Sequence, residues 1–215
     1  MNITIIGAGK MGSGLAMRFA LAGHDVTIAS FSMELAREAA QNAREKSGCT
    51  NIHCGLNAEA AAAAELVVLV IPVTSRREVL EELRDILREK IVLDITIPMA
   101  FNPIRYAPPA EGSNAQETLA ILGEGSRVVS GFHTVSFTLL HKLEQPLSGS
   151  TLITGSDEDS RKAIMTLAES VGLRPVDAGG LEHAATVESL TPMLLGINKR
   201  YGVGGAGVDI TGLDR

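Results

Sequence analysis

Short runs of apolar, mainly β-branched residues alternate along most of the chain with longer stretches rich in Ala, Leu, Glu and Arg. Each short run predicts a strand, and each long stretch with apolar positions three or four apart predicts a helix. The expected strands are 3–6, 25–29, 51–54, 66–71, 91–95 and 127–130. The expected helices are 11–21, 33–46, 58–64, 75–88 and 116–122. This alternation with short connections predicts an α/β fold with a Rossmann-type doubly wound parallel sheet.

The pattern changes in the second half of the chain. The stretch 98–112 carries four prolines without helical spacing and is expected to form a loop. After about His141, strands at 151–154 and 173–176 flank a helix at 157–170. The tail 181–200 is expected to be helical, with Thr191 and Pro192 as N-cap and first helical residue. We therefore expect a main domain over 1–140 and a small C-terminal α/β-helical segment over 141–215.

Composition limits the function classes. A chain of 215 residues with 45% apolar residues can bury an ordinary core. The net charge of −6 and only 3% aromatic residues argue against a nucleic-acid partner. The longest apolar run, Leu66–Ile71, is far shorter than the roughly 20 residues of a membrane span. No basic and then apolar leader precedes Ile3, and Cys49 and Cys54 are expected to be reduced thiols, so we expect a cytoplasmic protein with no membrane partner.

The first predicted strand runs into the sequence Gly-x-Gly-x-x-Gly, from Gly7 to Gly12, which opens the first predicted helix. This context is typical of a dinucleotide site. Gly7 allows the tight turn, Gly9 lets a pyrophosphate approach the backbone, and Gly12 lets the helix pack on the strand. We expect backbone groups of Gly7, Gly9, Lys10, Met11 and Gly12 to hold the pyrophosphate at the helix N-terminus.

The end of the second strand bears on which dinucleotide binds. NAD enzymes usually place Asp or Glu there, on the ribose 2′-hydroxyl. This chain has Ser30, Phe31 and Ser32, which favours NADP and leaves NAD as the alternative. We expect Ser30 and Phe31 to contact the adenosine ribose or its phosphate. Arg37 is the nearest following cation, and it is equally well interpreted as a solvated helix charge.

Other candidates follow later strands, because open α/β sheets bind ligands at the carboxyl ends of their strands. Those after the fourth strand are expected to wall the nicotinamide: Ile71, Pro72 and Val73. His133 and Thr134 follow the sixth strand and are expected at the site of a second ring. His133 either orients the substrate, exchanges a proton near neutral pH, or is a structural imidazole bonded to the backbone.

Metal and hydrolase chemistry have little support. Cys49, His53 and Cys54 lack a second ligand pair, and His53 and Cys54 would point to opposite faces of a strand, so we expect no metal site. The acidic run Asp157–Asp159 is interpreted as a helix cap. The chain has no Gly-x-Ser-x-Gly sequence, which would mark a serine hydrolase.

Several stretches resemble the NADP oxidoreductases that use the deazaflavin coenzyme F420. They are 14–18, 21–24, 71–72, 172–179 and 187–192, together with His133 and Thr134, which match a His-Thr pair of that family. The resemblance implies hydride exchange between NADPH and coenzyme F420, with His133 as the candidate catalytic residue. It also implies a homodimer joined through the C-terminal helices, with the C-terminal segment completing the substrate site. The glycine loop resembles, more distantly, those of pyrroline-carboxylate reductases and hydroxyacid dehydrogenases.

The chain departs from that family's pattern at three places. The family's glycine loop is one residue longer, its Ser at the Ser30 position is followed by Arg where this chain has Phe31, and it has a large aromatic residue where this chain has Val73. These departures leave two alternatives open. One is an NAD(P)H-dependent reductase of another small acceptor, such as an imine, carbonyl or flavin. The other is a dinucleotide sensor without catalysis.

Overall fold

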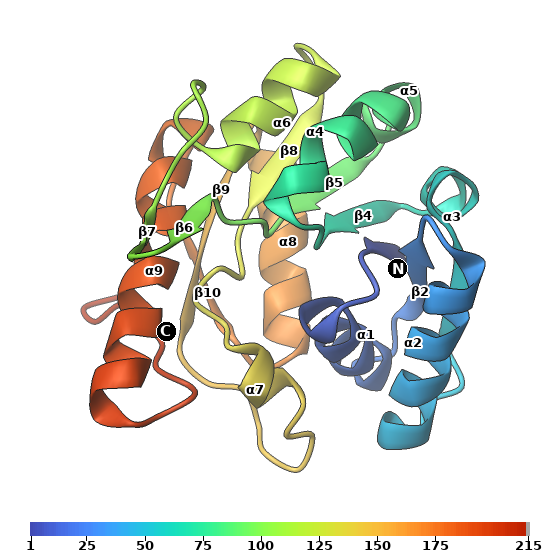
Figure 1. Ribbon diagram of the computed structural model, residues 1–215, viewed down its shortest axis with the longest axis horizontal. Coiled ribbons are helices and arrows are strands. Elements are labelled where there is room, and N and C mark those ends of the chain that lie inside the picture. The colour runs from blue at the N-terminus through green and yellow to red at the C-terminus, as the bar shows by residue number, and fades with distance from the viewer. Residues whose placement is uncertain (214–215) are drawn as a thin grey trace.

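An eight-stranded sheet forms the centre of the computed structural model, which describes residues 1–213 (Figure 1). The strands have the spatial order β10-β9-β8-β5-β4-β1-β2-β3. Their bounds are β1 (Asn2–Ile6), β2 (Asp25–Ser30), β3 (Ile52–Leu56), β4 (Leu66–Leu69), β5 (Ile91–Asp94), β8 (Arg127–Ser130), β9 (Ser150–Gly155) and β10 (Arg174–Asp177).

The six strands from β3 to β8 are all parallel and have the order of a doubly wound sheet. This confirms the predicted Rossmann-type α/β fold. Strand β9 pairs antiparallel with β8, and β10 pairs parallel with β9, so residues after 141 extend the same sheet. The division of the chain at residue 140 stays a prediction.

Helices cover both faces of the sheet (Figure 1). Apolar residues of α1 (Lys10–Leu21), α2 (Met33–Ser47) and α8 (Glu158–Ser170) form the core on one face. Residues of α3 (Asn57–Ala63), α4 (Val73–Glu82), α5 (Arg84–Leu87) and α6 (Asn114–Leu122) form the core on the other. Successive β4 residues alternate between them, with Val68 in the first core and Val67 in the second. The unbroken apolar run therefore reflects burial on both faces.

Two predicted helix caps are confirmed. The Ser32 hydroxyl accepts a hydrogen bond from the Leu35 N–H at the start of α2. The Asp157 carboxylate accepts one from the Ser160 N–H at the start of α8. Such side chains satisfy donors that have no partner within the helix.

The expected loop at 98–112 contains a hairpin instead. Strands β6 (Met99–Phe101) and β7 (Ile104–Tyr106) pair antiparallel, beside α9 (Ala184–Tyr201) in Figure 1. Three-residue strands are too short to produce a visible alternation of apolar and polar positions. Contacts from distant residues also hold the hairpin, because the Tyr106 hydroxyl donates to the Glu188 carboxylate on α9.

Two helix boundaries differ from the predictions. The expected helix 75–88 is interrupted at Leu83, which separates α4 from α5. The assignment of Thr191 and Pro192 to a helix start is wrong, because α9 begins at Ala184, after a 3₁₀ turn (Leu181–His183), and contains Pro192 in its interior. A proline there removes one helical hydrogen bond. Pro192 and Leu194 are both buried in α9, and this apolar burial offsets part of the cost of the lost hydrogen bond. No helix among residues 1–213 is long and apolar enough to cross a membrane.

Candidate functional site

The three motif glycines of the β1–α1 loop occupy different environments. Gly7 has φ +132°, and a Cβ there would lie 2.2 Å from the Val70 carbonyl oxygen. A Cβ on Gly12 would lie 2.0 Å from the Gly7 carbonyl oxygen, so helix and loop are in direct contact. A Cβ on Gly9 would meet no atom within 4 Å. Gly7 and Gly12 are therefore required by packing, whereas Gly9 faces open space.

The N-terminus of α1 offers free backbone donors to a ligand. Gly9 is its N-cap and supplies no side-chain cap, and the first bond within the helix is from the Ser13 N–H to the Gly9 carbonyl. The N–H groups of Lys10, Met11 and Gly12 precede that bond and have no intrahelical acceptor. Because these donors and the helix dipole favour anions, the loop fits a diphosphate.

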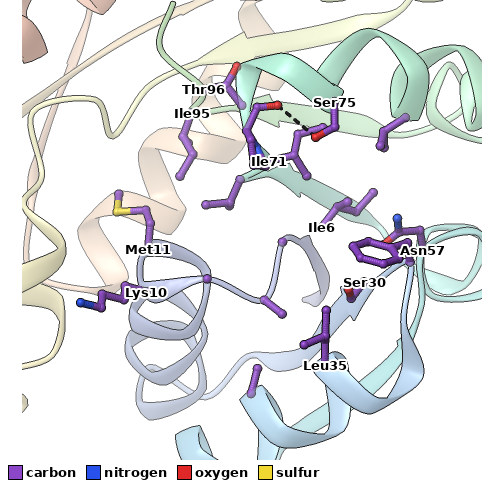
Figure 2. A pocket seen from close by; sticks show the side chains of 18 of the residues that line it. Ile6, Lys10, Met11, Ser30, Leu35, Asn57, Ile71, Ser75, Ile95 and Thr96 are labelled. Atoms are coloured by element: carbon purple, nitrogen blue, oxygen red, sulfur yellow. Dashed lines mark hydrogen bonds between the residues drawn. The ribbon is translucent and has the colours of Figure 1, made fainter. Parts of the chain in front are cut away.

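A cavity of about 1020 Å³, the nucleotide pocket, opens over this loop (Figure 2). Its walls come from the glycine loop, the end of β2, α2, the start of α3 and the segment from β4 into α4. The predicted residues that line it are Gly7, Gly9, Lys10, Met11, Ser30, Phe31, Ile71 and Pro72. In Figure 2, Met11, Ile95 and Thr96 lie on one side, and Ser30, Leu35 and Asn57 lie on the other.

Three predicted cofactor residues lie outside this lining. Gly12 packs beneath the loop, against Gly7. Val73 is the first residue of α4 and is 46% exposed. Thr134 is buried and donates to the Ser150 carbonyl, 3.2 Å away. Gly12 and Val73 therefore lie beside the other cofactor candidates without lining the pocket, and Thr134 lies apart from them.

The end of β2 is polar and then aromatic. The Ser30 hydroxyl is nearly buried and accepts from the Ser32 N–H at 3.3 Å. The Ser32 hydroxyl is engaged with the Leu35 N–H as the α2 cap. Phe31 is 83% exposed, and Arg37 is exposed and lies outside the pocket lining. Ser30 and Phe31 are thus the side chains that this strand end presents to the pocket.

A second pocket of about 480 Å³ adjoins the first. It shares Met11 and Ile95 with the nucleotide pocket and is otherwise lined by residues between Ile97 and Ala206. Most of its lining is apolar, with His133 and Thr134 among its polar residues. The two pockets therefore adjoin at Met11 and Ile95.

His133 enters the second pocket after a turn at Phe132, which has φ 63°. Positive φ is unusual for a bulky residue, and burial against Phe19 holds Phe132 in place. The His133 Nε2 lies 2.8 Å from the Ser130 hydroxyl, and its Nδ1 has no partner among the described residues. Burial lowers the pKa of His133 to about 4, against the opposing charge of Asp94. The imidazole is therefore neutral near pH 7, with the Ser130 hydroxyl beside its Nε2.

A buried ionic network beside the site escaped the sequence analysis. Arg76 on α4 is 1% exposed, pairs with Asp94 at 2.8 Å and with Glu117, and donates to the Thr96 hydroxyl at 3.0 Å. Burial alone would raise the pKa of Asp94, but Arg76 and the hydroxyls of Thr118 and Thr96 hold it below its ordinary value. The network fixes Thr96 at the edge of the nucleotide pocket.

Glu188 on α9 was also missed. Its buried carboxylate accepts from the N–H groups of Asn114 and Ala115, at 3.0 and 3.1 Å, and from the Tyr106 hydroxyl. Burial raises the pKa of Glu188 to about 7, although the two backbone donors oppose the shift. These bonds tie α9, which supplies Thr191 and Leu194 to the second pocket, to α6 and the hairpin.

The cysteine and histidine candidates for a metal are separate from both pockets. His53 lies 2.8 Å from the Asp25 carboxylate, and Cys49 and Cys54 are free thiols packed against the core. Within residues 1–213 no group of three or more His, Cys, Asp or Glu side chains could hold a metal ion.

Comparison with known proteins gives consistent matches. Residues 2–98 match the family model described as NADP oxidoreductase, coenzyme F420-dependent. The chain is 36% identical to the F420-dependent NADP reductase of Methanothermobacter thermautotrophicus, over 99% of this chain and 96% of that protein. It is 35% identical to the reductase of the same name from Methanocaldococcus jannaschii, over the full length of both. A crystal structure from Arthrobacter sp. FB24, provisionally described as an F420-dependent NADP reductase, superposes with a TM-score of 0.85 at 23% identity, over 98% of this chain and 99% of that one.

Proposed function

Because the chain belongs to the family of coenzyme F420-dependent NADP oxidoreductases, we propose that it transfers a hydride between NADP(H) and the deazaflavin coenzyme F420. The observation that carries this proposal is the pair of adjoining pockets that share Met11 and Ile95. Hydride transfer between two planar rings needs a short distance and correct stacking more than it needs a side-chain acid or base. Because Met11 and Ile95 line both pockets, the two pockets meet there, and rings that extend to this junction would come into contact.

The nucleotide pocket provides the cofactor half of the proposed site. The α1 N-terminus and the loop from Gly7 to Gly12 would bind the diphosphate through backbone N–H groups. Ser30 and Phe31 would contact the adenosine, and Ile71, Pro72, Ile95 and Met11 would enclose the nicotinamide. Val73 would act only through the start of α4, since its side chain lies outside the lining. When bound, the dinucleotide and the deazaflavin supply the hydride and its acceptor carbon.

The second pocket would hold the deazaflavin ring. The apolar lining excludes water, and Thr134 stays fixed by its bond to Ser150. His133 is the candidate polar contact, because it lines this pocket and its buried Nδ1 has no hydrogen-bond partner among the described residues. Being neutral near pH 7, it would orient the ring by a hydrogen bond rather than exchange a proton.

We further propose a homodimer in the cytoplasm that binds neither nucleic acid nor membrane. Exposed apolar side chains lie on α9, on the turn after it and on the neighbouring hairpin: Met193, Tyr201, Val203, Phe101 and Ile104. Exposed apolar side chains in this part of the molecule are suited to a protein interface. The net charge of −6 disfavours binding to polyanions such as nucleic acids. Light scattering after gel filtration measures the mass of the particle in solution and so tests the homodimer.

The test is oxidation of NADPH by the purified protein with oxidised coenzyme F420, followed through the visible absorbance of the deazaflavin. Rapid bleaching supports the proposal. Tight dinucleotide binding without bleaching contradicts it. Turnover with an imine, carbonyl or flavin would then favour the reductase alternative, and binding without turnover on any acceptor would favour the sensor.

A further inference from the structure

The adenosine end of the nucleotide pocket is built from β2, α2 and α4. In a Rossmann fold the adenosine ribose lies at the end of the second strand, which here is Ser30. Phe31 follows, lines the pocket and is 83% exposed. An aromatic face in this position offers a stacking surface to the adenine ring. That contact is the same for NADH and NADPH.

Three carboxylates line the pocket: Glu38 on α2, and Glu78 and Glu82 on α4. The lining cation is Lys10, which belongs to the glycine loop, and its amine lies 5.8 Å from the centre of the Phe137 ring of the second pocket. The helix that follows Ser30 and Phe31 therefore contributes a carboxylate to the pocket, whereas the lysine amine lies toward the second pocket.

The 2′-phosphate that distinguishes NADPH from NADH has a charge of about −1.5 to −2 at neutral pH. Strong binding of such a group uses a bidentate arginine. Here the Ser32 hydroxyl is the α2 cap, and the Ser30 hydroxyl has the Ser32 N–H as a donor. Each hydroxyl accepts in these bonds and keeps its own hydrogen, so the two serines offer at most two neutral contacts. Glu38 on the following helix repels the phosphate, although solvent screens part of that repulsion.

We infer that the pocket gains little affinity from the 2′-phosphate, so that the chain binds NADH about as well as NADPH, because Phe31 occupies the position from which an arginine would bind that phosphate. The inference rests on the proposed function, in which this pocket holds the nicotinamide dinucleotide. It concerns only the adenosine end and does not depend on which acceptor occupies the second pocket.

The experiment is a titration of the full chain with NADPH and with NADH, each followed by nicotinamide fluorescence, without coenzyme F420 present. For the unmodified chain we expect dissociation constants within about tenfold of each other. In Phe31→Arg we expect NADPH to bind at least about tenfold more tightly relative to NADH, and this gain to shrink at high salt, because the new contact is ionic. The exposure of Phe31 makes the variant compatible with folding.

Phe31→Leu is the matched control, because it removes the ring without adding a charge. It should weaken both dinucleotides by a similar factor and leave their ratio unchanged. A preference of the unmodified chain for NADPH above about tenfold, or an unchanged ratio in Phe31→Arg, overturns the inference. If the chain binds dinucleotides but does not reduce coenzyme F420, the proposed function is wrong and this inference still stands, since the titrations contain no acceptor. Failure to bind either dinucleotide overturns both.

Discussion

At the scale of single residues, Gly9 and Gly12 form a matched pair. A side chain on Gly9 projects into open space, so Gly9→Val should fold normally and weaken NADPH binding by at least about tenfold by blocking the approach of the diphosphate. Gly12→Ala places a Cβ 2.0 Å from the Gly7 oxygen and should lower the free energy of unfolding by about 1–3 kcal/mol. Thermal unfolding and NADPH titration of both variants check this. Unchanged affinity for NADPH in Gly9→Val would show that the glycine loop does not bind the diphosphate.

The sequence predicted the glycine loop because each glycine has a backbone task that depends only on spacing. It did not predict the burial of Arg76, although Arg76 lies three and four positions before Val79 and Leu80, on the apolar face of its helix. That spacing was available as a signal. Its partners Asp94 and Glu117 come from β5 and α6, and only the fold brings them together.

At the scale of elements, Arg76 joins α4 to β5 and α6. Arg76→Met would leave Asp94 buried without its cation, and breaking such a pair costs about 3–5 kcal/mol. Arg77→Met is the control on the same helix: Arg77 is about half exposed, and its partner Glu117 keeps its ion pair with Arg76 in that variant, so the loss should be below about 1 kcal/mol. Urea unfolding of the two variants measures both values. Equal losses of free energy of unfolding in the two variants would show that the buried pair of Arg76 and Asp94 stabilises the fold no more than the exposed Arg77 does.

Whether the sequence predicted an element depends on how far apart in the chain the residues that form it lie. The parallel strands and their helices were predicted, because each has its own run of apolar residues that is long enough to show a period. The hairpin β6–β7 and the path of α9 through Pro192 were not, because they depend on Glu188, which bonds the start of α6 and Tyr106. The second pocket draws its walls from this same region, so its composition was largely hidden from the sequence.

At the scale of the whole molecule, the pKa values of two buried groups, Glu188 and His133, shift in opposite directions on folding. Burial raises the pKa of Glu188 from 4.5 to about 7, so between these values the folded chain keeps a proton that the unfolded chain has released. This contribution to stability falls as pH rises. Burial lowers the pKa of His133 from 6.5 to about 4, so the unfolded chain binds a proton that the folded chain excludes. This contribution rises with pH, and the two largely cancel between pH 4.5 and 6.5.

Single substitutions should expose each contribution. In Glu188→Gln the free energy of unfolding should rise with pH across this window by about 1.4 kcal/mol per pH unit, because Glu188 no longer opposes the contribution of His133. In His133→Asn it should fall with pH, because His133 no longer opposes the contribution of Glu188. Denaturant unfolding at several pH values gives both slopes. Slopes of the same sign in the two variants would contradict the opposed shifts.

The shared wall of Met11 and Ile95 has a consequence for how such a molecule diverges. The nucleotide pocket is lined by residues 6–96, and the second pocket, Met11 apart, by residues 95–206 of the described chain. Inherited changes in the later part of the chain can therefore remodel one chamber while the other keeps its ancestral form. Met11, at the start of α1, lines both chambers, so a substitution there alters the binding of two ligands at once.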